Sequence, residues 1–482
     1  MNYLILSIIA RSMECRKPID NLGISNVRWR QNPPEQVATQ NIDPGIVVSW
    51  SCDPWHTGAV EILADLQARG LIHDTTDIEE MGRQLAAGSI TLYCGFDPTA
   101  DSLHVGNLIG LLTLRRFQMA GHKPISLAGG ATGMIGDPSG KSSERNLLDD
   151  SGLAENLEGI VPQLRQFLDF DGPCAAKLLD NRAWTVGVSV LDFLRDIGKH
   201  VTVNQMMAKD SVKNRMNDGD GISYTEFSYM LLQGYDYLWL AENEGCALQV
   251  GGSDQWGNIL LGIDLIRRKL GKSAHALTWP LLTKPDGSKY GKTAGGETIW
   301  LSANKMSPYR FYQSWIGVED LEVKKLLLQL TFMSVDEVDS LAKAHESDPG
   351  SRIGQRVLAY ELTSIVHGAR SAEAAVQASE VLFGKGTDPR SVSKSALEFV
   401  STEVPSSIYT TNDLALIDVL TETGLVASKG EAKRAFAEGS IYLNGDRILD
   451  PAALVTPADF LHEQYLLLRR GKKKWHVIEL SR

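Results

Sequence analysis

One stretch near residue 100 combines side chains that could hold a nucleotide. It runs from Tyr93 to Asn107 and reads Tyr-Cys-Gly-Phe-Asp-Pro-Thr-Ala-Asp-Ser-Leu-His-Val-Gly-Asn. A short apolar run, a Gly/Pro break and a helical apolar periodicity predict a strand, a turn and a helix that starts near Ser102. His104 and Asn107 would then lie one turn apart beside the unpaired N–H groups of the helix start, where a phosphate is favoured. Gly106 between them has no side chain to block a ligand.

A second stretch far downstream favours the same chemistry. Residues 286–296 read Asp-Gly-Ser-Lys-Tyr-Gly-Lys-Thr-Ala-Gly-Gly and set Lys289 and Lys292 in a glycine-rich loop. A lysine ammonium is a compact charge on a flexible stem, and the glycines would let the loop open and close over phosphates. Each stretch alone also has a structural explanation, as a surface histidine or as a solvated charged loop.

These residues need a sheet and helices to position them. Residues 124–141 form another short apolar run that enters a glycine-rich turn. The spacing is not Gly-x-Gly-x-x-Gly and no apolar helix follows directly, which argues against a dehydrogenase. From about residue 153 to residue 270, helical patterns alternate with short apolar runs, as in a parallel sheet covered by helices. The sequence therefore predicts an α/β fold with a Rossmann-like parallel-sheet domain.

The pattern along the chain divides it into five parts. Ser307 and Pro308 are typical of an N-cap and a first helical position, after which the chain becomes largely helical. The predicted parts are a poorly ordered N-terminal extension (1–55), the Rossmann-like catalytic domain with N-terminal helices (56–300), a helical domain (301–395), a linker (396–412) and a small α+β domain (413–482).

The composition limits the class of protein. A chain of 482 residues with 43% hydrophobic and 22% charged residues is typical of a globular protein. The net charge of −11 argues against bulk nonspecific binding to nucleic acid, although a local basic patch could still hold RNA. Five scattered cysteines indicate neither a disulfide framework nor a zinc site, and favour a reducing compartment. No apolar run reaches the roughly eighteen residues of a membrane span.

Five motifs, in order along the chain, resemble those of bacterial-type tyrosyl-tRNA synthetases, which are class I aminoacyl-tRNA synthetases. The resemblance covers about residues 60–482. The motifs are residues 93–107, 129–141, 224–236, 251–258 and 289–293. The resemblance implies ATP-dependent activation of L-tyrosine to tyrosyl-adenylate with release of pyrophosphate, followed by transfer of tyrosine to the 3′ end of tRNA(Tyr). This chemistry needs reactants held in line and charge stabilised on the phosphates, and no catalytic base.

The resemblance also implies which residues contact ATP. His104 and Asn107 match the first and last positions of the HIGH-type signature, with asparagine in place of the commoner histidine. The loop residues Lys289, Lys292 and Thr293 match the KMSKS-type loop. Further implied contacts to ATP or its phosphates are Thr99, Gly106, Lys141, Arg145 and Asp254. We expect Mg²⁺ to accompany ATP through the phosphates, because the sequence has no evident carboxylate cage, and we expect no metal site on the protein itself.

The tyrosine pocket is implied by a further set of residues. Tyr229, Gln233 and Asp236 share one face of a predicted helix, which favours a polar pocket but is also compatible with ordinary helix structure. By resemblance, Tyr93 and Asp236 would hold the substrate hydroxyl, and Tyr229, Gln233 and Asp137 would surround the α-amino group. Gln255 would help to place the carboxylate, and Gly95 and Asp97 would border the same end. This family is itself the standard example of a hydroxyl-binding site that rejects phenylalanine without editing.

The C-terminal residues resemble an S4-type RNA-binding domain, in which two helices precede a strand and a turn. A basic footprint beside Trp475 would suit phosphates, with a solvated charge run as the alternative. The predicted RNA-binding residues are Lys429, Lys433, Arg434, Arg469, Arg470, Lys472, Lys473 and Lys474.

The implied partners are tRNA(Tyr), L-tyrosine and a second copy of the chain in a homodimer, with Tyr224 in part of the interface. We expect a cytoplasmic protein, although residues 1–55 could carry an organellar address or reflect a misassigned start codon. One alternative is tryptophanyl-tRNA synthetase, against which Tyr93 and Asp236 argue. The other is a noncatalytic RNA-binding or splicing protein on the same scaffold, against which His104 and the loop lysines argue.

Overall fold

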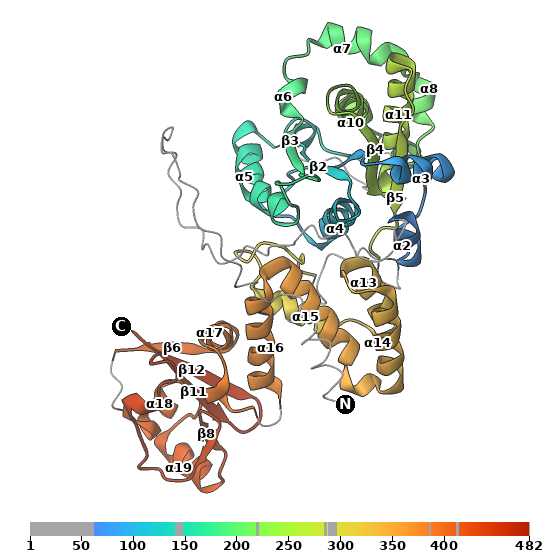
Figure 1. The fold of residues 1–482 in the computed structure, drawn as a ribbon. Helices are drawn as coiled ribbons and strands as arrows, with labels where there is room; N and C mark the ends of the chain where they lie inside the picture. Colours follow the sequence, from blue (N-terminus) through green and yellow to red (C-terminus); the bar gives the residue numbers. More distant parts are fainter. Residues whose placement is uncertain are drawn as a thin grey trace, which may run out of the picture.

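The computed structural model describes residues 62–139, 148–217, 221–283, 287, 296–384, 387–410 and 414–481 (Figure 1). The expectation for residues 1–55 falls outside these ranges. Within them, no helix combines the length and the apolar character needed to cross a membrane.

A five-stranded sheet forms the centre of the first domain and confirms the predicted α/β class. Every neighbouring pair of strands is parallel, and the spatial order is β3-β2-β1-β4-β5. Because β1 has β2 on one side and β4 on the other, the order reverses at β1, and the carboxyl ends of β1 and β4 open a crevice there. The strands are β1 (Thr91–Phe96), β2 (Lys123–Ala128), β3 (Lys177–Asp180), β4 (Cys246–Gly252) and β5 (His275–Trp279).

Helices cover both faces of this sheet, and the alternation along β1 explains how. Leu92 and Phe96 of β1 pack in the same core as α4 and α5, whereas Tyr93 packs in the core built by α10 and α11. Successive strand residues point to opposite faces, so each face needs its own helices. The helices of this domain in the described ranges are α2 (Ile62–Ala68), α3 (Ile78–Ala87), α4 (Val105–Met119), α5 (Asp150–Gln166), α6 (Arg182–Thr185), α7 (Val190–Asp196), α8 (Val203–Met207), α9 (Asp210–Asn217), α10 (Tyr224–Asn243) and α11 (Trp256–Leu270).

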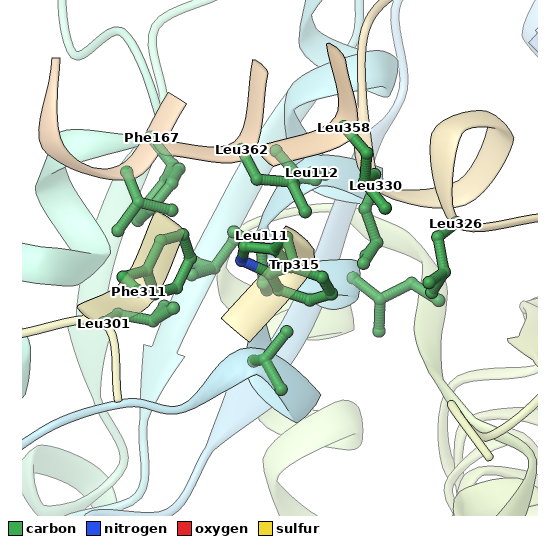
Figure 2. Close-up of a cluster of buried hydrophobic side chains, with 14 of the residues drawn as sticks. Leu111, Leu112, Phe167, Leu301, Phe311, Trp315, Leu326, Leu330, Leu358 and Leu362 are labelled. Carbon is green, nitrogen blue, oxygen red and sulfur yellow. The ribbon is translucent and has the colours of Figure 1, made fainter. Parts of the chain in front are cut away.

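The helical domain shares one hydrophobic core with the sheet domain. Leu111 and Leu112 of α4 lie against Trp315, Leu330 and Leu358 of the helical domain, as Figure 2 shows. A helix apolar on nearly all sides is typical of this position, because α4 is covered by the sheet on one side and by helices on the other. The helices concerned are α12 (Pro308–Ile316), α13 (Asp320–Leu330), α14 (Val335–Ser347), α15 (Ile353–His367) and α16 (Ala369–Phe383).

Two capping interactions fix the helical domain. The predicted start of α12 is confirmed: Ser307 Oγ accepts a hydrogen bond from the backbone N–H of Arg310 at 3.2 Å, and Pro308 is the first helical residue. Where α4 meets the helical domain, the buried guanidinium of Arg116 donates to the carbonyl oxygen of Thr331 at 2.6 Å. Burial lowers the pKa of Arg116 to about 9, and the cation satisfies a carbonyl beyond the C-terminus of α13.

The described part of the predicted linker, residues 396–410, contains regular secondary structure. Residues 396–412 include most of α17 (Lys394–Glu403) and strand β6 (Ser406–Tyr409). Strand β6 pairs in parallel with the last strand of the C-terminal sheet, and the apolar side of α17 packs with Leu467 and Val477 of that sheet. Ser401 and Thr402 lie in the last turn of α17, and Pro405 directly precedes β6.

The C-terminal domain has the predicted order of two helices, a strand and a turn. Helices α18 (Leu416–Glu422) and α19 (Lys429–Ala437) precede the hairpin of β8 (Ile441–Leu443) and β9 (Asp446–Ile448). Both turn residues of the hairpin have positive φ, 47° at Asn444 and 92° at Gly445, which is the Asn-Gly preference of a tight hairpin. The remaining strands are β7 (Leu414–Ala415), β10 (Leu454–Val455), β11 (Tyr465–Arg470) and β12 (Lys474–Leu480), and the larger sheet has the order β6-β12-β11-β8-β9.

Candidate active site

A cavity of about 840 Å³ opens at the carboxyl ends of β1 and β4, where the strand order reverses. This is the position at which open parallel sheets bind ligands. The cavity brings together most of the predicted site residues: Tyr93, Gly95, Asp97, Thr99, His104, Gly106, Asn107, Asp137, Tyr229, Gln233, Asp236, Asp254 and Gln255.

At one end of the cavity, His104 and Asn107 form a reciprocal cap on α4. His104 Nδ1 accepts from the backbone N–H of Gly106 at 3.0 Å, and Asn107 Oδ1 accepts from the backbone N–H of His104 at 3.1 Å. The helix therefore begins at Val105, with His104 as its N-cap, rather than near Ser102 as expected. The expectation placed the start too early because the apolar pattern extends ahead of the cap.

The cap determines which atoms of these two side chains can donate. An imidazole Nδ1 that accepts a hydrogen bond carries no proton, so the proton of neutral His104 lies on Nε2. Asn107 uses its carbonyl oxygen in the cap, so its amide nitrogen is the end that donates elsewhere. A Cβ at Gly106 would lie 2.7 Å from His104 Cε1, so the glycine makes room for the histidine ring as well as for a ligand.

Asp97 is a shared acceptor in the middle of the cavity wall. Tyr229 donates its hydroxyl to Asp97 Oδ2 at 2.8 Å, and Thr132 donates to Asp97 Oδ1 at 2.7 Å. A Cβ at Gly129 would lie 2.1 Å from Asp97 Oδ1, so only glycine allows the carboxylate at this place. Burial and the nearby Asp97 charge raise the pKa of Tyr229 well above its ordinary value, so Tyr229 stays a hydrogen-bond donor.

Asp236 forms the buried end of the cavity and is held by two donors. Asn181 Nδ2 donates to Asp236 Oδ2 and Trp184 Nε1 donates to Asp236 Oδ1, both at 2.9 Å. The Trp184 ring stacks on Trp239 with 4.1 Å between ring centroids. Burial raises the pKa of Asp236 to about 7, the two donors act to lower it, and the negative charges of Asp97 and Asp180 add to the rise.

Tyr93 presents an unsatisfied hydroxyl in this cavity. The side chain is only 1% exposed, and its hydroxyl has no hydrogen-bond partner among the described residues. A buried hydroxyl without a partner costs about 1–3 kcal/mol, so a polar ligand atom beside it would be stabilised. Gln249 Oε1 of β4 is also buried and unpartnered in this part of the chain, and it lines the same cavity.

Near the other wall, Gln255 donates to Asp137 Oδ2 at 2.6 Å, and the backbone N–H of Ser139 donates to Asp137 Oδ1 at 2.9 Å. Gln233 lies on α10 four residues after Tyr229, as the helical spacing predicted. Asp137 and Gln255 thus form a hydrogen-bonded pair in the cavity wall. Asp137 lies in the segment that follows β2, and Gln255 lies in the segment that follows β4.

Five predicted residues lie outside the described residues: Lys141, Arg145, Lys289, Lys292 and Thr293. Among the residues that the structure does describe, no group of three or more His, Cys, Asp or Glu side chains has the arrangement of a metal site.

Sequence reasoning missed the residues that hold the ligand-facing groups in place. Thr132, Asn181 and Gln249 line the cavity, and Trp184 donates to Asp236 behind it. Asn181 follows β3 directly, and a polar residue at the carboxyl end of a parallel strand is a usable signal. Trp184 carries no such signal, because its contact with Asp236 joins residues 52 positions apart.

The predicted RNA-binding residues of the C-terminal domain fall into two groups. Lys433, Arg434, Lys472, Lys473 and Lys474 are exposed.

The others have partners within the domain. Lys429 forms an ion pair with Asp418. Arg470 pairs with Glu431 at 2.7 Å and donates to the carbonyl oxygen of Leu425.

Arg469 is held between two aromatic rings, with its guanidinium carbon 4.2 Å from the centroid of Tyr442 and 5.0 Å from that of Trp475.

Comparison with known proteins agrees with this architecture. Residues 85–384 match the family model of class I tRNA synthetases (W and Y), and residues 396–478 match the tyrosine-tRNA ligase SYY-like C-terminal domain. The chain is 50% identical over 425 residues to the tyrosine-tRNA ligase of Opitutus terrae, covering 87% of this chain and 99% of that protein. The chain belongs to the tyrosine-tRNA ligase family. These matches favour tyrosine over the tryptophan alternative.

Further tyrosine-tRNA ligases give the same result. The enzyme of Geobacillus stearothermophilus is 47% identical over 424 residues, covering 88% of this chain and 100% of that protein. A C-terminally truncated mitochondrial tyrosyl-tRNA synthetase of Aspergillus nidulans superposes with a TM-score of 0.61 at 31% identity, covering 67% of this chain and 94% of that one. The predicted fold class and family are therefore confirmed.

Asp236→Asn tests the charge state of the buried carboxyl. The folded-state pKa of about 7 lies above the ordinary 3.8, so the folded chain binds this proton more tightly than the unfolded chain. Stability contributed by Asp236 is then lost as the pH rises from about 4 to about 7. The free energy of unfolding of the wild type, relative to Asp236→Asn, should fall across that interval by up to about 4 kcal/mol. Urea unfolding at a series of pH values measures it.

Glu155→Gln, at an exposed position of α5, is the matched control, and its stability relative to the wild type should stay nearly constant across the same pH range. A constant difference between the wild type and Asp236→Asn would mean that Asp236 keeps an ordinary pKa.

Proposed function

We propose that this chain activates L-tyrosine with ATP to form tyrosyl-adenylate, releases pyrophosphate, and transfers the tyrosyl group to the 3′ end of tRNA(Tyr). The observation that carries the proposal is one cavity with two unlike ends. A buried aspartate and a buried tyrosine hydroxyl form one end, and the capped start of α4 forms the other. An amino acid that spans the cavity would bring its carboxylate toward the helix start.

The buried end suits a phenol. Each oxygen of Asp236 accepts one hydrogen bond from the protein, and an ionised carboxylate has lone pairs left for a further donor. The substrate hydroxyl donates to Asp236 and accepts from Tyr93, whose hydroxyl otherwise has no described partner. Phenylalanine would leave the Tyr93 hydroxyl buried and unpaired and would offer no further donor to Asp236, which is the basis of strong discrimination in this family.

The α-ammonium needs acceptors, and the cavity wall offers several. Asp137, Tyr229 and Gln233 surround it, and Gln255 helps to place the carboxylate. Asp97 belongs to the same wall through its bond to Tyr229.

ATP occupies the end formed by α4. The Nε2–H of His104 and the amide of Asn107 donate to the phosphates or ribose, next to the N–H groups at the helix start. Thr99 and Gly106 border the phosphates, and Asp254 contacts the ribose.

The remaining predicted residues are assigned by their motifs, because they lie outside the described residues. We assign the cations Lys141, Arg145, Lys289 and Lys292, and the hydroxyl of Thr293, to the stabilisation of the departing pyrophosphate. A Mg²⁺ ion bound with ATP would supply charge neutralisation at the phosphates.

The reaction is thus catalysed by position and by charge. The tyrosine carboxylate attacks the α-phosphorus while pyrophosphate leaves in line, so no side chain has to take a proton. Donors fixed by the fold, such as the capped His104, need no reorganisation as negative charge grows on the phosphates.

ATP–pyrophosphate exchange driven by each of the twenty amino acids tests the proposal. Tyrosine should support exchange, and phenylalanine should support at least about a thousandfold less, because it leaves the Tyr93 hydroxyl unpaired and offers no further donor to Asp236. Asp236→Asn should lower kcat/KM for tyrosine far more than it changes KM for ATP.

Exchange with tryptophan instead of tyrosine would move the assignment to tryptophanyl-tRNA synthetase. No exchange with any amino acid would favour a noncatalytic RNA-binding or splicing protein.

The C-terminal domain binds tRNA(Tyr) through its exposed cations in this proposal. Lys433, Arg434 and residues 472–474 are the phosphate contacts, and Lys429 and Arg470 contribute as well, although each also forms an ion pair within the domain. Arg469 joins the surface through its stack on Tyr442 and Trp475.

Replacing Lys472 and Lys473 together by glutamine should weaken tRNA(Tyr) binding and leave tyrosine-dependent exchange unchanged. The slope of log K against log salt should become shallower by about 1.4–1.8, because each lost phosphate contact removes about 0.7–0.9. Filter binding across a salt series measures it. The matched control replaces Lys343 and Lys394, which are exposed on α14 and α17. An unchanged slope would remove these two lysines from the RNA surface.

The homodimer is proposed on an apolar surface that the described chain leaves uncovered. Helix α7 is rich in valine and leucine but has no buried residue. Val190 is 74% exposed, Leu191 79%, and Tyr224 at the start of α10 72%. Large exposed apolar patches mark interaction sites, and a second copy of the chain is the occupant that the family resemblance implies.

Sedimentation equilibrium should give twice the chain mass of 52.8 kDa. Introducing charge with Leu191→Glu and Tyr224→Glu should shift the protein toward the monomer, because burying two unpaired carboxylates is costly. Leu321→Glu is the control, since Leu321 is 89% exposed on α13. A wild-type protein of single-chain mass would reject the dimer.

We propose a cytoplasmic location, which fits the scattered cysteines and the bacterial relatives. An organellar address in residues 1–55 is the alternative.

A further inference from the structure

A lysine that the motifs do not include ends a chain of hydrogen bonds behind the tyrosine pocket. Lys209 Nζ donates to Asn258 Oδ1 at 3.2 Å. Asn258 Nδ2 donates to Gln233 Oε1 at 2.9 Å and lies 3.4 Å from Gln255 Oε1. Gln255 Nε2 then donates to Asp137 Oδ2. This series of hydrogen bonds therefore connects the ammonium group of Lys209 to three side chains of the amino-acid site.

The ammonium gives this chain its direction. When Lys209 is protonated, its ammonium can only donate, so Asn258 has to turn its carbonyl oxygen toward Lys209 and its NH₂ group toward the glutamines. Asn258 is 4% exposed, so water cannot freely substitute for either contact. Both glutamines must in turn offer their oxygens to Asn258, and this leaves the NH₂ group of Gln255 for Asp137.

The orientation matters for the charge of the substrate. Gln233 Oε1 has a second lone pair and can accept from the α-ammonium of tyrosine while it accepts from Asn258. If Asn258 turned over, its carbonyl would draw the NH₂ group of Gln233 toward it. Gln233 would then no longer present its Oε1 acceptor to the α-ammonium of tyrosine. An N–H donor would face this cationic group instead.

The position of Lys209 is costly for a residue that serves packing alone. Its stem lies against the first turn of α11, where a Cβ on Gly257 would be 3.3 Å from Lys209 Cδ. A helix N-terminus disfavours a cation, and burial lowers the pKa of Lys209 to about 7 while the Asp137 carboxylate opposes that shift. A methionine would fill the same space without this cost.

We propose that Lys209 is a positioning residue for tyrosine, which fixes the amide of Asn258 and through it the acceptor oxygen of Gln233 and the donor of Gln255. The inference rests on the proposed function, because it assigns Lys209 to the amino-acid half of that reaction. Lys209 does not line the cavity, so it acts through Asn258 and does not touch the substrate.

Lys209→Met tests the proposal by ATP–pyrophosphate exchange. KM for tyrosine should rise about tenfold or more, because acceptors for a charged group are lost. The kcat value and KM for ATP should stay within about twofold. Lys209→Arg keeps a donor and should recover part of the loss. Lys272→Met, at an exposed position after α11, is the matched control and should change neither constant.

A double-mutant cycle separates positioning from other roles. Asn258→Ser should raise KM for tyrosine by itself, and adding Lys209→Met to Asn258→Ser should then cost little more, because both changes break the same chain. Additive losses would overturn the proposal, as would a Lys209→Met variant that loses only ATP or tRNA affinity. Tyrosine-dependent exchange by the unchanged chain is the criterion for the proposed function, so the two hypotheses can fail separately.

Discussion

Two carboxylates in the wall of one cavity impose the main constraint on this fold. A buried carboxylate is tolerated only when donors surround it. Asp97 is supplied by Tyr229 and Thr132, and Asp236 by Asn181 and Trp184. These donors come from α10, from the turn after β2 and from the segment after β3, so three separate parts of the sheet domain converge on the same small volume.

The parallel sheet makes that convergence geometrically simple. Because β1 is flanked by β2 and β4, the loops after all three strands meet at one edge. Glycines permit the close approach: a side chain at Gly129 would overlap Asp97, and one at Gly130 would lie 2.2 Å from Asp180 Oδ1. The glycines of the turn after β2 therefore make room for the carboxylates of Asp97 and Asp180.

Helix α4 links this site to the rest of the molecule. Its first residues are capped by His104 and Asn107 in the cavity, and its body lies in the core shared with the helical domain (Figure 2). Near its C-terminus, Arg116 donates to Thr331 beyond the end of α13. The orientation of the capped end is thus set by packing along the whole helix, which gives the helical domain a role in holding the nucleotide end of the cavity.

The sequence by itself determined the fold class, the family and many of the polar residues that line the cavity, because long motifs and local periodicity are properties of neighbouring residues. The helical spacing of Tyr229, Gln233 and Asp236 placed them on one face of a helix, and the break after β1 placed a turn at the site. Local pattern misjudged the start of α4, where a cap rather than apolar spacing sets the boundary, and it did not predict α17 and β6, which the structure shows between residues 394 and 409.

Only the tertiary structure decided how the polar groups are paired. Trp184 meets Asp236, and Lys209 meets Asn258, across 52 and 49 positions of the chain. No local pattern encodes such a pair, since each hydrogen bond depends on how two distant segments pack. The sequence supplied polar side chains that line the cavity, whereas packing supplied the partners that fix their orientation and charge.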